Sequence, residues 1–327
     1  MRGVHACAAA GLALALAACA PAKAPLPEQP VPADGTIRIV AEPVPLDPSD
    51  AARDRIGDFT FAGAVTLTSP DTARLHGLSD LEIAPDGGVM AVSDEGDLLR
   101  ARLQLGKDGR LVGLSGGRIT ALPGLDGKPL PGKLAADAEG LALLPGGDLL
   151  VSFEQNHRIW LYPAAGGPPR PAPAPDAVFP ANGGMEALGP DPAAGPDAYV
   201  VGGEESGQTW TCRLSADCRP GPPVAKDGAF GLVAVRRLSE GRTAWLLRAY
   251  DPLRGSRIEL RIAGPHGDLA SVTLSRPLTV DNFEGLAATP IAGGYRFYLL
   301  SDDNFQSLQR TILMALDWRP HAKETTP

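Results

Sequence analysis

The segment DNFEGLAATPIAGGYRFYLLSDDNFQSLQRT, residues 281–311, holds the pattern that decides the fold. Two short apolar runs, Leu286–Ala288 and Tyr295–Leu300, flank the dipeptide Gly293-Gly294, which is a hairpin turn signal. Acids and amides bound the two runs: Asp281, Asn282 and Glu284 before the first, and Asp302, Asp303 and Asn304 after the second. The segment therefore predicts a β-hairpin with polar groups on both sides.

The same plan recurs along the chain. Each copy has a short apolar strand, a Gly/Pro/Asp turn, a second apolar strand, a polar cluster and a third, alternating strand. The copies begin about 45–55 residues apart, which is the blade period of a β-propeller. Five copies are clear: 78–103, 137–162, 184–214, 229–262 and 282–318. A sixth is expected from 36–70 together with the last strand, so we predict an all-β propeller of six blades, closed by the N- and C-terminal strands.

Composition limits the classes of function. The chain has 327 residues, 44% of them hydrophobic, which suffices for a packed core. Its net charge is −8 and it has no run of Lys or Arg, so no nucleic-acid partner is expected. We expect a monomer.

The N-terminus has the features of an export signal. Arg2 precedes the apolar stretch Ala8–Ala18, and Leu16-Ala17-Ala18-Cys19 resembles a bacterial lipobox. The expected organisation is a signal peptide over 1–18, a lipidated Cys19 with a Pro/Ala-rich tether over 19–35, the propeller over 36–320 and a tail over 321–327. This predicts a protein of the bacterial cell envelope, anchored by the lipid and facing the periplasm, with the outer membrane favoured. The alternative is an ordinary secretory peptide with an incidental cysteine.

Cys212 and Cys218 are the remaining pair of thiols downstream of Cys19. Two thiols this close in an exported protein favour a disulfide that closes a small hairpin. A two-cysteine metal site is the alternative, but no histidine lies nearby in the sequence.

Alignment of the copies places three glutamates, Glu139, Glu186 and Glu284, at one position just before the innermost strand. Ser79 and Phe230 stand there in the other two copies. In a propeller, equivalent positions converge on the axis, so these carboxylates would face one another and repel unless a cation lies among them. With Asp302 they predict a site for a hard cation such as Ca²⁺. A structural role, in which such groups bond the backbone of the next blade, is the alternative.

A second polar position follows the second strand of each copy, and it is acidic in four of the five. Arg248 occupies it in the fifth copy and could bind an anionic group. We expect four residues of this set to contact a small anionic or ester substrate: Asp94, Glu154, Arg248 and Asn304. His76 and His157 are further candidates for general bases, with no nucleophile beside them in the sequence.

Several of these segments resemble one known family. DAEGLALLPGG-DLLVSFE at 137–154, NGGMEAL at 182–188, LLRAYDPLRGSRIELRI at 246–262 and 281–318 are similar to the phytase-like family named for an esterase-like activity of phytase. The resemblance covers most of 60–318 and implies an exported bacterial propeller related to the phytases that use Ca²⁺ to hydrolyse phosphate esters.

The resemblance implies a Ca²⁺-dependent hydrolase of phosphate or carboxylic esters at the central channel, with Glu139, Glu186, Glu284, Asp302 and Asn304 facing the channel. The Glu-Gly steps also look like those of gluconolactonase-type enzymes, which implies a metal-dependent lactonase as a second possibility. A third is a propeller that binds an envelope partner or ligand without catalysis.

Overall fold

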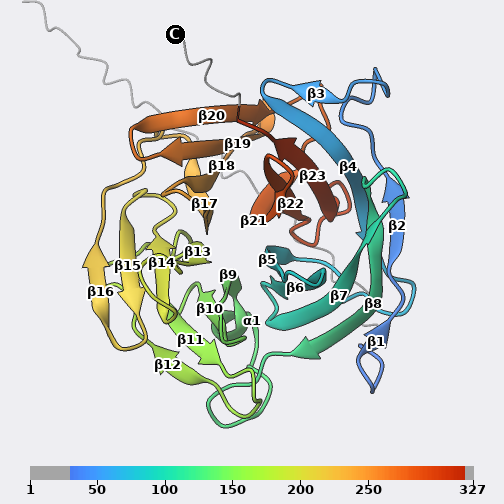
Figure 1. Cartoon of the computed structure of the whole chain (residues 1–327). Helices are drawn as coiled ribbons and strands as arrows, with labels where there is room; N and C mark the ends of the chain where they lie inside the picture. Colours follow the sequence, from blue (N-terminus) through green and yellow to red (C-terminus); the bar gives the residue numbers. More distant parts are fainter. Residues whose placement is uncertain (1–29, 321–327) are drawn as a thin grey trace, which may run out of the picture.

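Five antiparallel sheets surround a central axis in the computed structural model, which describes residues 30–320 (Figure 1). The predicted signal peptide, Cys19 and the 321–327 tail lie outside the described residues. The described part has one short helix, α1 (Lys133–Ala136). None of the described helices is long and apolar enough to cross a membrane.

Four sheets each contain four consecutive strands, to which the first sheet adds β1, and Figure 1 shows them as blades around the axis. The first sheet contains β5 (Leu78–Ile83), β6 (Gly88–Ser93), β7 (Asp97–Leu105), β8 (Leu111–Ala121) and β1 (Thr36–Ile37). The second contains β9 (Ala138–Leu143), β10 (Leu149–Phe153), β11 (Arg158–Tyr162) and β12 (Arg170–Ala172). The third contains β13 (Ala187–Pro190), β14 (Ala198–Gly202), β15 (Thr209–Arg213) and β16 (Ala216–Pro220). The fourth contains β17 (Gly231–Arg237), β18 (Thr243–Asp251), β19 (Gly255–Gly264) and β20 (Gly267–Leu274).

The fifth sheet combines strands from both ends of the described chain. It contains β21 (Asn282–Ile291), β22 (Gly294–Asp302), β23 (Ile312–Trp318), β4 (Phe59–Thr68), β2 (Val40–Pro43) and, beside β4, β3 (Arg55–Ile56). β4 pairs antiparallel with β23, with Ile312 opposite Thr66. The described residues thus form five blades, not the six expected. The reason is that 36–70 adds outer strands to the first and fifth sheets, and no strands remain for a blade of its own.

Apolar residues between neighbouring sheets form the core. One cluster, for example, joins Leu81 and Leu99 of the first sheet to Leu313 and Ala315 of the fifth. Strands such as β10 are buried along their whole length, which explains their continuous apolar sequence. The five innermost strands, β5, β9, β13, β17 and β21, contact one another in that order around the ring.

A buried ion pair joins these innermost strands at the axis. Asp80 of β5 and Arg236 of β17 lie 3.1 Å apart, and Asp80 also accepts the backbone N–H groups of Leu81, Leu141 and Leu286. Arg236 donates to the carbonyl groups of Leu81, Leu141, Leu188 and Val235. All five blades therefore bond to this pair, which fills the channel below its mouth.

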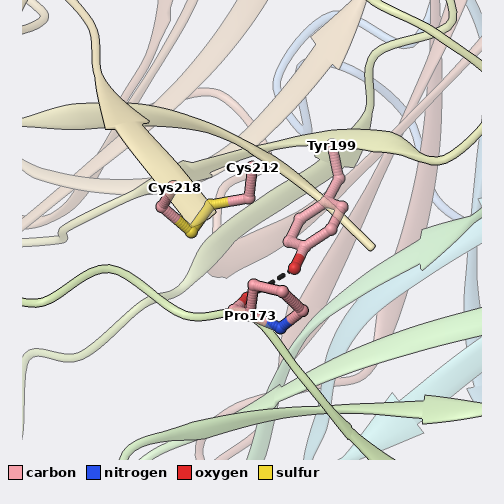
Figure 2. The surroundings of a disulfide bond; sticks show 4 residues. All are labelled: Pro173, Tyr199, Cys212 and Cys218. Carbon is pink, nitrogen blue, oxygen red and sulfur yellow. Dashed lines mark hydrogen bonds between the residues drawn. A yellow bond between two sulfur atoms is a disulfide. The ribbon is translucent and has the colours of Figure 1, made fainter. Parts of the chain in front are cut away.

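The cysteine pair lies in the outer part of the third blade. Cys212 of β15 and Cys218 of β16 form a disulfide that closes this hairpin (Figure 2). Tyr199 of β14 is fully buried beside it and donates its hydroxyl to the carbonyl of Pro173. The disulfide links two peripheral strands, and neither cysteine lines the mouth of the channel.

Candidate functional site: an acidic mouth at the propeller axis

A bulge near the start of the inner strand sets the position of the predicted glutamates. The pairing register shifts by one residue at Glu139 in the second blade and at Glu284 in the fifth. The same shift occurs at Ser79 in the first blade and at Val233 in the fourth. In the third blade, Glu186 directly precedes β13. The equivalent of the glutamates in the fourth blade is thus Val233. The alignment that used Phe230 was wrong by three residues because it matched Phe230-Gly231-Leu232 to the Glu-Gly-Leu steps of other blades, whereas strand pairing places the bulge at Val233.

The end of the second strand supplies the other ring of polar groups. In each blade, one charged residue at or near the end of the second strand lies opposite a residue at or just before the start of the inner strand. These residues are Asp94, Glu154, Glu204, Arg248 and Asp302. Backbone hydrogen bonds fix this register, for example from the Glu154 N–H to Asp137 and from the Glu204 N–H to Gly184. The polar positions that recur in the sequence therefore form two rings of side chains around one axis.

Both rings line one pocket of about 280 Å³, which we call the acidic mouth. Eight carboxylates line it: Asp94, Asp137, Glu139, Glu154, Glu186, Glu204, Glu284 and Asp302. The lining has two cationic side chains, Lys133 and Arg248, and three amides, Gln155, Asn182 and Asn304. The carboxylates so outnumber the cations that the mouth needs either protons or further cations to be stable.

Burial and mutual repulsion raise the pKa values of these acids. Burial raises the pKa of Glu139 well above its ordinary value, and the charges of Glu186 and Glu284 raise it further. Burial also raises the pKa of Glu154 to about 7 and that of Asp94 to about 6. For Asp302, burial raises the pKa well above the ordinary range, and the charge of Glu284 adds to the effect. The mouth therefore favours proton or cation binding near neutral pH.

Three of the carboxylates are close enough to share one ion. Asp137, Glu139 and Glu154 each offer an oxygen, and these oxygens lie within 4.8 Å of one another. The Oδ2 atom of Asp137 is buried and accepts no hydrogen bond from the described residues. An all-oxygen donor set with such an unpartnered oxygen fits a hard divalent cation such as Ca²⁺.

Arg248 neutralises the opposite side of the mouth. Its Nη1 atom lies 2.7 Å from Glu284 and 2.9 Å from the side-chain oxygen of Asn282, and its Nη2 atom lies 3.0 Å from Glu204. Burial would lower the pKa of Arg248, but the charges of Glu284, Glu186 and Glu204 together raise it. Arg248 thus holds two carboxylates in place. These contacts involve Nη1 and Nη2 of the guanidinium group.

Lys133 of α1 neutralises the other side. Its Nζ atom lies 2.7 Å from Asp94 Oδ2 and 2.7 Å from Asp137 Oδ1. Arg158 fixes the helix: it donates to the Ala135 carbonyl and stacks on the ring of Phe153, with its guanidinium carbon 4.0 Å from the ring centroid. The helix and the second blade therefore form one unit at the rim.

The structure brings together all eight residues that were expected to bind a metal or substrate: Glu139, Glu186, Glu284, Asp302, Arg248, Asn304, Asp94 and Glu154. Asn304 has a left-handed backbone (φ 49°), and its N–H donates to Asp302. His76 and His157 are not in the lining. His76 packs edge-on against Phe305, with ring centroids 3.9 Å apart, and His157 bonds to the carbonyl of Pro180.

Sequence reasoning did not single out Lys133, Asp137 or the axial pair. Lys133 lies in α1 and Asp137 directly follows this helix, so neither belongs to the strands that carry the repeat. The axial pair left a signal in the repeat. Asp80 stands where other copies have Gly140, Ala187 or Gly285, and Arg236 stands where the second and fifth copies have Ala142 and Ala287 and the first has Glu82. Opposite charges at these inner positions, which are small in most copies, are the signal of a partnership across the axis.

Comparison with known proteins places this geometry in a family. The model of the phytase-like family, described as "Esterase-like activity of phytase", matches residues 73–305. This span is more than half of the chain and covers all five inner strands. The protein therefore belongs to the phytase-like family, as its motifs predicted. No sequence of a curated protein matches the chain significantly.

Several solved structures match the chain at low identity. A candidate gluconolactonase is 14% identical with a TM-score of 0.46, covering 89% of this chain and 92% of its own. Virginiamycin B lyase from Staphylococcus aureus is 11% identical with a TM-score of 0.43, covering 86% and 99%. The allergen Mala s 1 of Malassezia sympodialis is 13% identical with a TM-score of 0.45, covering 85% and 96%. These descriptions differ from one another, and the fold does not specify a reaction.

Proposed function

We propose that the protein is a divalent-cation-dependent hydrolase of small phosphate or carboxylic esters, with its site in the acidic mouth. The observation that carries the proposal is the excess of eight carboxylates over two cations in a single pocket at the axis. Membership of the phytase-like family supports an ester as the substrate. The oxygen-only donor set favours Ca²⁺ over softer metals.

The residues divide into two groups in this proposal. Asp137, Glu139 and Glu154 would hold the cation, because their oxygens already lie within 4.8 Å of one another. When bound, a divalent cation supplies Lewis-acid polarisation of an ester or phosphoryl oxygen and lowers the pKa of water. Glu186, Glu284 and Asp302 add negative charge around it. They attract the cation and need not all touch it.

Arg248 would orient the substrate. Its guanidinium group would bind an anionic oxygen, while its Nη2 and Nη1 atoms hold Glu204 and Glu284. The axial pair closes the channel below, so a substrate enters and leaves through the mouth. A lactone is an internal carboxylic ester, and it suits the same site.

The test uses chelator-treated protein with Ca²⁺, Mg²⁺ or Mn²⁺ added back. Thermal melting reports cation binding, and hydrolysis of p-nitrophenyl phosphate, p-nitrophenyl acetate and a simple lactone reports activity. We expect Ca²⁺ to raise the melting temperature and to restore activity. Glu139→Gln should abolish the melting shift and lower activity by at least about tenfold, whereas the exposed control Glu42→Gln should behave as the wild type.

Two outcomes would contradict parts of the proposal. If no divalent cation shifts the melting temperature, the metal site is wrong. If Ca²⁺ binds but none of the three substrate types is hydrolysed, the site binds a ligand without catalysis, which is the non-enzymatic alternative.

A further inference from the structure

We propose that Lys133 is a tethered counter-cation of the acidic mouth and sets its affinity for divalent cations. This inference rests on the proposed function and concerns the regulation of the same site. Lys133 bridges two carboxylates that belong to different blades, at 2.7 Å from Asp94 Oδ2 and 2.7 Å from Asp137 Oδ1. The Lys133 ammonium group thus already lies between two carboxylates, at a position that would otherwise favour a bound cation.

The bridged acids each keep one oxygen unused. Asp94 Oδ1 and Asp137 Oδ2 are both buried, and no described residue donates a hydrogen bond to either. The exposed fractions of the two residues are 6% and 1%, so bulk water does not solvate these oxygens. A buried carboxylate oxygen without a donor is costly unless a ligand satisfies it. Asp94 and Asp137 are therefore half-satisfied by Lys133 and half-available to a cation.

Asp137 connects the lysine to the expected cation site. It belongs to the compact group with Glu139 and Glu154, so a divalent cation held there is separated from the Lys133 ammonium by a single carboxylate. Two cations at this separation repel strongly in a partly buried site, where the effective dielectric constant is far below that of water. Lys133 must therefore weaken divalent cation binding while its ammonium remains on Asp137.

The same lysine stabilises the metal-free mouth. Without it, Asp94 and Asp137 would face each other and the remaining acids with no counter-charge on this side, because Arg248 serves Glu204 and Glu284. The Lys133 side chain is 53% exposed, so it can move into solvent when a cation takes its place. The rim helix that carries it stays fixed through the Arg158 contact with Ala135. A charge exchange at the mouth thus needs no refolding of the blade.

The experiment compares Lys133→Met with Lys133→Arg and with Lys128→Met, a change at an exposed lysine five residues away. Calorimetric titration with Ca²⁺ and thermal melting are measured on chelator-treated protein. Lys133→Met should melt lower than the wild type without a cation and should bind Ca²⁺ at least about tenfold more tightly. Lys133→Arg and Lys128→Met should keep an affinity within about threefold of the wild type.

A purely structural lysine gives a different result. In that case Lys133→Met would lower the melting temperature and leave Ca²⁺ affinity unchanged or weaker, which overturns the inference but leaves the proposed function standing. If Lys133→Met does not fold, Lys133→Gln removes the charge and keeps a hydrogen-bond donor, and the same affinities apply. If neither the wild type nor any variant binds a divalent cation, both proposals are overturned.

Discussion

Two groups of charged residues lie along the same axis, and they differ in how their charges are matched. At the axial pair, Asp80 accepts from three backbone N–H groups and from Arg236 on both of its oxygens. Each of these contacts brings a hydrogen-bond donor to Asp80. The Asp80 carboxylate must therefore be ionised, although burial raises its pKa. At the mouth, eight carboxylates share two cations, and some buried oxygens have no donor.

The difference separates charges with a structural role from the charges to which we assign cation binding. The axial pair bonds to all five blades. Arg236 Nε has no hydrogen-bond partner among the described residues, but it lies 3.6 Å from the Glu82 carboxylate, so its charge is matched within the core. At the mouth, the same blades hold carboxylates close together although some of their buried oxygens accept no hydrogen bond. Its inner-ring acids Glu139 and Glu284 lie two residues before Leu141 and Leu286, whose N–H groups bond to Asp80. The rigid axial group therefore holds the repelling acids in position.

The comparison predicts its largest effect at the axis. Arg236→Met leaves Asp80 and Glu82 buried without their cation, so the free energy of unfolding should fall by about 3–5 kcal/mol. Urea denaturation measures this fall. The control Arg237→Met removes a neighbouring and more exposed arginine, which lies 3.3 Å from Asp191, and should cost less than about 1 kcal/mol. Equal losses in the two variants would show that the axial pair has no special role.

The second prediction is a dependence of stability on pH. The pKa of Glu154 is raised to about 7 and that of Asp94 to about 6, so the folded state binds more protons than the unfolded state between about pH 4 and 7. The contribution of these two acids to the stability of the metal-free protein is therefore fully present below their unfolded pKa values, and stability should fall by about 2 kcal/mol between pH 5 and pH 8.

Glu82 at the axis contributes to the same pH window, because burial raises its pKa to about 7. The two sites can be separated. Ca²⁺ should reduce the part of the stability loss between pH 5 and pH 8 that comes from the mouth, and it should leave the part due to Glu82. Glu82→Gln should remove the part due to Glu82 and leave the part that comes from the mouth. Denaturation curves at pH 5 and 8 with and without Ca²⁺ measure both parts. A metal-free protein that becomes more stable as the pH rises would contradict the assignment.

The smallest expected effect is a gain in stability, whereas Arg236→Met should cause a loss. Glu186→Gln removes one of the mutually repelling charges of the mouth, so the metal-free protein should gain on the order of 1 kcal/mol of stability. The same change should reduce the stabilisation by Ca²⁺. Melting curves with and without Ca²⁺ test it, and Glu205→Gln, at an exposed neighbour of the mouth, is the matched control. If Glu186→Gln is less stable than the wild type at pH 8, Glu186 has a structural role, such as a hydrogen bond to the backbone of the next blade.

Much of the site could be predicted from the repeat. Glu139, Glu186 and Glu284 recur at one position, and a ring of blades brings equivalent positions to the axis. Arg248 was recognisable as the one cation in an otherwise acidic set. The blade number was not predictable in this way, because 36–70 has strands whose partners are chosen by edges that form elsewhere in the chain. The equivalent position in the fourth blade was not predictable either, because Phe230-Gly231-Leu232 resembles the Glu-Gly-Leu steps while strand pairing places the bulge at Val233.

The sequence by itself determined the all-β class, the repeat and the residues of the two polar rings, because period and alternation are local properties of the chain. Only the tertiary structure decided which of these charges are matched. The pairing of Asp80 with Arg236 spans 156 positions, and the Lys133 bridge from Asp94 to Asp137 joins two blades. Such contacts depend on how far apart two side chains lie in space. Distance and burial, and not residue type, therefore made one group of charges a structural centre and left the other with unpaired carboxylate oxygens, on which the proposed cation site rests.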